Sequence, residues 1–274
     1  METLSDILRI ALPILYGTGA ILYVSYFFKR VDHLKFAATG ALVTAILAHL
    51  WYVILLGVLL GRHPMANIFE FLSFVAMTMA LIYLFLQIWY RNGYIGVFIV
   101  PAVFLLQFVA TLGLDSSAPL RPLLQEERFA LHATAIAAAY AAYFLCMMYA
   151  VMVLLFERSI RRHRFGILFE QLPSLDVLAK MTTVTLLIGF GMMSIGLGLG
   201  ALGALDAPPP VHLDTKVILT VLVWLLYGFA VVSRFVLRWS DRVCAMLSII
   251  GFIFLVLTTV TSHVTFSSWH NFIG

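Results

Sequence analysis

Histidine side chains are the groups in this sequence that could most readily do chemistry. His132 follows a charged stretch at the start of one hydrophobic run, and His270 lies just beyond the last hydrophobic run. A neutral imidazole can bind a transition metal or a haem iron through one ring nitrogen. Two such rings from different helices could therefore form an axial pair on one iron.

Three further side chains lie close to this pair in the sequence. Arg128 precedes His132 by four residues, so both project from one face of a helix, and its guanidinium could pair with a propionate. His263 and Trp269 lie close to His270 and are further candidates for the same pocket. The alternative is that the histidines are interfacial residues, hydrogen-bonded to lipid headgroups or to backbone.

Two polar residues inside hydrophobic runs are also candidates for cofactor binding. His49 falls near the middle of the second run, where a polar ring is costly unless it is paired. Its alternative role is a hydrogen bond between helices. Glu70 lies two residues after the start of the third run, where the helix dipole favours a carboxylate. It is therefore either a cap or the partner of an outer histidine or a buried arginine.

The elements that must position these residues are membrane-spanning helices. The chain has 274 residues, of which 63% are hydrophobic and 11% charged, and its mean hydropathy is +1.03. A soluble protein of this length could not bury so many apolar side chains. We predict an all-α polytopic membrane protein, a single transmembrane domain over residues 1–274 with no separate soluble domain. Eight runs are of spanning length: about 7–28, 36–60, 68–90, 95–114, 129–156, 181–205, 216–237 and 243–266.

The distribution of basic residues predicts the orientation. Twelve Lys and Arg residues lie beside the odd-numbered loops, against five beside the even-numbered loops and the two tails. The positive-inside rule then puts the odd loops in the cytoplasm and both termini outside, as in a multi-pass protein of a bacterial inner membrane. His132, His263 and His270 would lie at the outer face. The basic clusters are typical of span ends in contact with lipid, so no nucleic-acid partner is expected.

Other kinds of chemistry have little support in the sequence. Cys146 and Cys244 form no C-x-x-C motif and are expected to pack as small apolar residues. No nucleotide-binding glycine loop, nucleophile elbow or metalloprotease motif is present. Small residues crowd the sixth run, and we interpret them first as contacts for close helix packing and second as a hinge: Gly189, Gly191, Ser194, Gly196, Gly198, Gly200 and Gly203.

Several segments together resemble the cytochrome c assembly protein family, and specifically its eight-span, HemX/YpjD-like branch. They are Pro64–Glu70, Leu131-His132, Trp224–Gly228 and the ending from Ser248–Phe252 to Ser268–Asn271. The resemblance implies that His132 and His270 are the two outer histidines that flank a haem-presenting loop in this family. It also implies a tryptophan-rich loop between the sixth and seventh runs.

The sequence departs from the family at that loop. Residues 206–216 contain no tryptophan, and only Asp214 and Lys216 match the family's Asp-Pro-Lys ending. We therefore expect non-covalently bound haem b, held for haem handling or cytochrome c assembly without covalent attachment of the haem. One alternative is a HemX-like, non-catalytic regulator or scaffold that acts on a haem-biosynthesis enzyme through the basic loop 157–180. A second is a small-molecule or ion transporter that uses His49.

Overall fold

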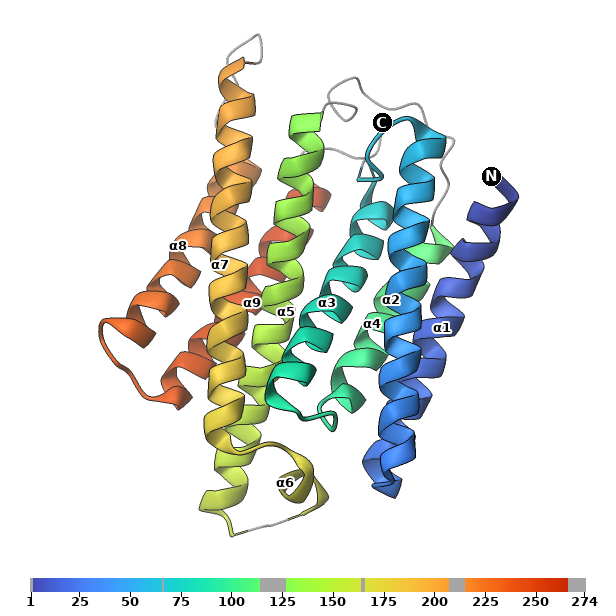
Figure 1. Cartoon of the computed structure of the whole chain (residues 1–274). Coiled ribbons are helices and arrows are strands. Elements are labelled where there is room, and N and C mark those ends of the chain that lie inside the picture. The colour runs from blue at the N-terminus through green and yellow to red at the C-terminus, as the bar shows by residue number, and fades with distance from the viewer. Residues whose placement is uncertain (1, 66, 114–126, 164–165, 207–214, 266–274) are drawn as a thin grey trace. The chain divides into compact units, whose positions relative to one another are not determined.

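The protein is built from α-helices. The computed structural model describes residues 2–65, 67–113, 127–163, 166–206 and 215–265, and over these residues it contains helices and no strands (Figure 1). In chain order the helices are α1 (Glu2–Lys29), α2 (Asp32–Leu60), α3 (Ile68–Tyr90), α4 (Gly96–Leu112), α5 (Glu127–Arg161), α6 (Ile167–Gln171), α7 (Leu175–Asp206), α8 (Thr215–Phe235) and α9 (Asp241–Thr265). The all-α prediction is confirmed.

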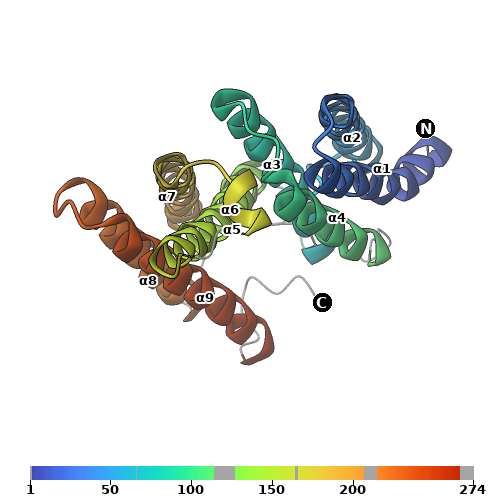
Figure 2. The ribbon, with the colours of Figure 1, turned by 90° about the horizontal axis from the view of Figure 1, so that it is seen from below.

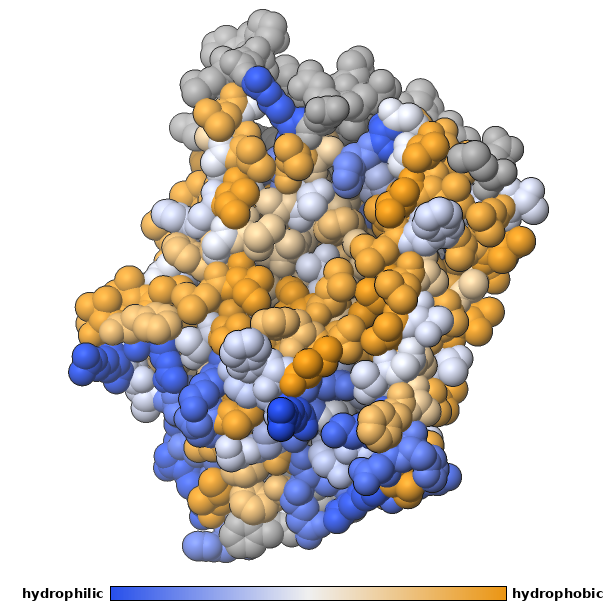
Figure 3. All heavy atoms as spheres, viewed as in Figure 1, coloured by the Kyte–Doolittle hydropathy of each residue, from blue (hydrophilic) through white to orange (hydrophobic). Residues whose placement is uncertain are grey.

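Each predicted hydrophobic run coincides with a helix. Seven of these helices are long and apolar enough to cross a membrane, and α4 is a shorter apolar helix of 17 residues. At 1.5 Å per residue α4 is about 25 Å long, slightly less than the roughly 30 Å of bilayer hydrocarbon. Hydrophobic side chains cover much of the helix surface in Figure 3, and hydrophilic side chains gather toward helix ends. The chain is a multi-pass membrane protein, and the orientation of its termini stays a prediction.

The helices form two compact units. Unit 1 comprises residues 1–130 and 167–173, and unit 2 comprises residues 131–166 and 174–274. The single transmembrane domain over residues 1–274 stays a prediction.

Unit 1 is organised around contacts among its first four helices. In this unit α1 packs against α2 and α4, and α3 packs against the same two helices (Figure 2). One close approach is at Gly96 of α4, where an added β-carbon would lie 2.2 Å from the ring of Tyr23. Gly61 ends α2 with a φ of 62°, and the Asn67 side chain accepts a hydrogen bond from the backbone N–H of Glu70 to cap α3.

Unit 2 has a core to which α5, α7, α8 and α9 all contribute. The tyrosines at 143 and 227 stack there, with ring centroids 3.5 Å apart. Three glycines of α7 face side chains of α5: Gly189 faces Tyr143, Gly196 faces Ile136 and Gly200 faces His132. A β-carbon at any of the three would lie within 3 Å of the facing side chain. The interpretation of these three glycines as packing contacts is therefore confirmed.

Candidate functional site

His132 lies in the second turn of α5 and is fixed by a hydrogen bond to α7. Its Nδ1 is 2.7 Å from the backbone carbonyl oxygen of Gly196. A carbonyl oxygen can only accept, so Nδ1 carries the proton and the lone pair of the neutral ring is on Nε2. Histidines that bind metals commonly donate their other ring N–H to a backbone carbonyl in this way, because the bond fixes both tautomer and ring orientation.

The residues packed around His132 restrict the rotation of its ring. A β-carbon built on Gly200 would lie 2.9 Å from Cε1 and 3.0 Å from Nδ1 of the ring, so only glycine leaves this orientation undisturbed. The ring is half-buried. The positive charge of Lys216, at the start of α8, acts electrostatically on it. A half-buried imidazole within the field of a positive charge favours an anionic ligand over a cationic one.

The structure describes only some of the residues predicted to surround His132. His270 and Trp269 lie outside the described residues, and His263 lies in the last turn of α9 without a described side chain. Arg128 is exposed in the first turn of α5, one turn before His132. The proposed ligand pair and its neighbours therefore stay predictions.

Glu70 is paired with a buried arginine, which was one of the two alternatives considered for it. Its carboxylate oxygens accept from both terminal nitrogens of Arg62, at 2.9 and 3.0 Å. The side chains are only 6% (Arg62) and 1% (Glu70) exposed. Arg62 also donates to the backbone carbonyl of His63, so the same side chain holds the connection between α2 and α3 in place. Two opposite charges with this bidentate geometry compensate for much of their loss of hydration.

His49 is fully buried and has hydrogen-bond partners on both ring nitrogens. Nδ1 is 3.1 Å from the Tyr16 hydroxyl, and Nε2 is 3.0 Å from the Ser73 hydroxyl. The Ser73 hydroxyl donates to Oε1 of Gln107, whose Nε2 donates to the Thr111 hydroxyl at 3.3 Å. Since the Ser73 proton is already used, Ser73 accepts from His49, and Tyr16 donates to His49. One directed chain of hydrogen bonds thus joins α1, α2, α3 and α4.

We expect replacement of His49 by leucine to lower the free energy of unfolding by about 1–3 kcal/mol, because the buried Tyr16 hydroxyl loses its acceptor. Unfolding in detergent micelles measures the change. Thr44→Val is the matched control, because Thr44 lies on the same helix and only donates back to Gly40. A leucine variant as stable as the wild type would contradict a structural role for the ring.

The sequence identified His49 and Glu70 as candidates, but it did not identify the residues that bond to them. Tyr16, Ser73 and Gln107 are polar residues inside hydrophobic runs, and that contrast could have identified them as partners for His49. Arg62 gave no such signal, because it lies beyond the end of α2 in a segment that reads as a polar loop.

The fold and these contacts define the class of protein. It is a polytopic helical membrane protein with an oriented histidine in the second turn of one spanning helix. Residues 65–270 match the Cytochrome C assembly protein family, which is more than half of the chain. The chain therefore belongs to that family, and the resemblance predicted from its motifs is confirmed.

Individual relatives match along most of the chain. Protein HemX of Brevibacillus brevis is 24% identical over 257 residues, which cover 91% of this chain and 94% of the relative. Cytochrome c biogenesis protein CcsA of Mesostigma viride is 25% identical over 266 residues, covering 88% and 85%. Its counterpart in Chlorella vulgaris is 26% identical over 226 residues, covering 70% and 72%.

Proposed function

We propose that this protein binds haem b non-covalently at the outer face of a bacterial inner membrane, with His132 and His270 as axial ligands. It would act in haem handling or cytochrome c assembly. The observation that carries the proposal is the hydrogen bond from His132 Nδ1 to the Gly196 carbonyl, which leaves Nε2 as the lone-pair nitrogen of an oriented ring. Membership of the cytochrome c assembly family supports the same assignment.

The described residues around His132 are compatible with a bound haem. Haem, when bound, would supply an iron that nitrogen ligands such as His132 and His270 could hold. Gly200 leaves room for the His132 ring, and Gly196 fixes its tautomer. Lys216 and Arg128 would offer positive charge to the propionates, while Trp269 and His263 would lie near the second ligand. Glu70 and His49, the other two predicted cofactor-binding residues, lie in unit 1, where an ion pair and a hydrogen-bond chain hold their side chains.

A visible spectrum of the protein purified in mild detergent tests the proposal. After expression with ample haem precursor, we expect a Soret band in the wild type that collapses in His132→Ala and in His270→Ala. His33→Ala is the control, because His33 is exposed at the start of α2 and is predicted to lie on the opposite side of the membrane. A colourless wild-type protein under these conditions would contradict haem binding.

A second candidate is a HemX-like regulator or scaffold that controls a haem-biosynthesis enzyme. The observation that favours it is the absence of tryptophan from residues 206–216, the segment where the resemblance implies a haem-presenting loop. The basic loop 157–180 would contact the enzyme, since Arg158, Arg161 and Arg162 are all exposed to solvent there. A colourless protein that still binds its partner enzyme, and loses it when these arginines are replaced, would favour this function.

A further inference from the structure

A pocket with a mixed polar and apolar lining lies in unit 2 near the turn that joins α8 to α9. It occupies about 270 Å³, including the part open to solvent. Its polar lining comes from three helices: Thr182 and Thr183 of α7, Arg234 of α8, and Asp241, Cys244 and Ser248 of α9. Polar linings of this kind inside a membrane bundle are tolerated where water reaches them.

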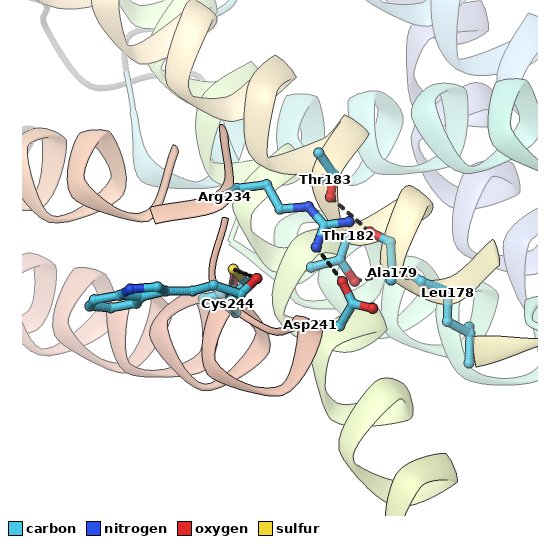
Figure 4. Close-up of polar contacts among 9 residues, drawn as sticks. Leu178, Ala179, Thr182, Thr183, Arg234, Asp241 and Cys244 are labelled. Carbon is cyan, nitrogen blue, oxygen red and sulfur yellow. Dashed lines mark hydrogen bonds and ion pairs between the residues drawn. The ribbon is translucent and has the colours of Figure 1, made fainter. Parts of the chain in front are cut away.

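Two of the residues that line this pocket form an ion pair. Arg234 pairs with Asp241, and their side chains are 26% and 39% exposed. Figure 4 shows the Arg234 side chain reaching between Asp241 and the threonines of α7. The hydroxyls of Thr182 and Thr183 donate to carbonyls of their own helix, so their oxygens can still accept hydrogen bonds from an incoming molecule.

Some residues that line the pocket lie next to the buried core of unit 2. The thiol of Cys146 donates to the carbonyl of Thr182 at 3.4 Å. Leu186 and Ser248 line the pocket, and Gly189 and Gly251, three residues further along α7 and α9, contact the stacked rings of Tyr143 and Tyr227. Three residues of helix correspond to about 4.5 Å. The tyrosine pair therefore lies about one helical turn beyond the pocket.

Three buried tyrosines of unit 2 have unsatisfied hydroxyls. Those of Tyr143, Tyr149 and Tyr227 are buried, and none has a hydrogen-bond partner among the described residues. A buried hydroxyl without a partner costs free energy, and a membrane bundle offers no bulk water to satisfy it. Buried polar groups in this position are commonly satisfied by ordered water, which makes two to four hydrogen bonds at such sites.

We propose that unit 2 binds water at this site: water enters beside Arg234 and Asp241, passes Thr182 and Ser248, and bonds to the hydroxyls of the buried tyrosines. The ligand is water because the hydroxyls to be satisfied are fully buried, and ordered water is the molecule that commonly satisfies such groups. The site is separate from His132 and does not depend on haem binding.

Radiolytic hydroxyl-radical footprinting of the wild-type protein tests this site, because radicals formed from bound water oxidise the side chains beside it. We expect oxidation of Tyr143, Tyr149 and Tyr227 to be several-fold faster than oxidation of Tyr16 and Tyr23. Those two tyrosines are matched controls, since they are equally buried but their hydroxyls are hydrogen-bonded to His49 and Gln87. Equal, slow oxidation of both groups would overturn the proposal.

A variant that narrows the pocket tests the route of entry. Thr183→Phe places an aromatic ring in the lining and should slow oxidation of Cys146 and Tyr227 several-fold, with Tyr16 unchanged. Unchanged oxidation of Cys146 and Tyr227 in a folded variant would overturn entry through this pocket. If the variant does not fold, the wild-type comparison of the two tyrosine groups still decides whether water is bound.

Discussion

Replacement of Arg62 by methionine is expected to lower the free energy of unfolding by about 3–5 kcal/mol, because it removes the cation that forms a bidentate ion pair with the buried Glu70 carboxylate. Glu70 lies in the first turn of α3, where Asn67 accepts a hydrogen bond from its backbone N–H and its side chain is 1% exposed. Denaturant unfolding in mixed micelles measures the change.

Two further variants separate the cost of breaking this ion pair from general disruption. Replacing Arg62 and Glu70 together by methionine should recover most of the loss, since neither charge of the pair then remains buried. Arg30→Met is the control for a surface pair, because Arg30 and Glu170 are 48% and 55% exposed; it should cost about 1 kcal/mol or less. A double variant as unstable as Arg62→Met would contradict this account of the ion pair.

Replacement of Gly200 by alanine is expected to remove most of the bound haem while His132 itself is kept. The new β-carbon would lie 2.9 Å from Cε1 of the His132 ring, closer than side-chain carbons approach one another. The ring must then rotate or move away, which strains or breaks the bond to Gly196 and misdirects Nε2. The ratio of Soret absorbance to protein absorbance measures the loss.

Gly198→Ala is the matched control on the same helix. A β-carbon at Gly198 meets nothing within 4 Å, so this variant should keep the haem content of the wild type. It changes the helix propensity of α7 as Gly200→Ala does, which leaves the contact with His132 as the difference between the two. Equal haem content in both variants would contradict the placement of His132 as a ligand.

Hydropathy alone predicts most of the fold, because a run of roughly 20 apolar residues in a membrane has few structures open to it. It is less accurate about helix ends. The fifth run was expected to end at residue 156, but α5 continues to Arg161. The extension carries an ion pair between Glu157 and Arg161, one turn apart, that supports the helix beyond the hydrophobic part.

The sequence predicted which residues belong to the candidate site, but it did not predict which residues they contact. His132 and Glu70 stood out as polar groups beside or inside hydrophobic runs. Their partners depend on tertiary structure: Gly196 bonds to His132 only because α7 packs against that face of α5, and Arg62 reaches Glu70 only because the chain turns at Gly61. A hydrophobic pattern records which face of a helix is apolar, but it does not specify which helix lies next to it.

The most direct test of haem ligation by His132 is chemical rescue of the His132→Gly variant. The purified variant is titrated with haem, with and without added imidazole, and the Soret and visible bands are compared with those of the wild type. We predict weak haem binding without imidazole, and return of the wild-type band positions when imidazole occupies the place of the lost ring. A variant that binds haem with wild-type bands before imidazole is added would show that His132 is not a ligand.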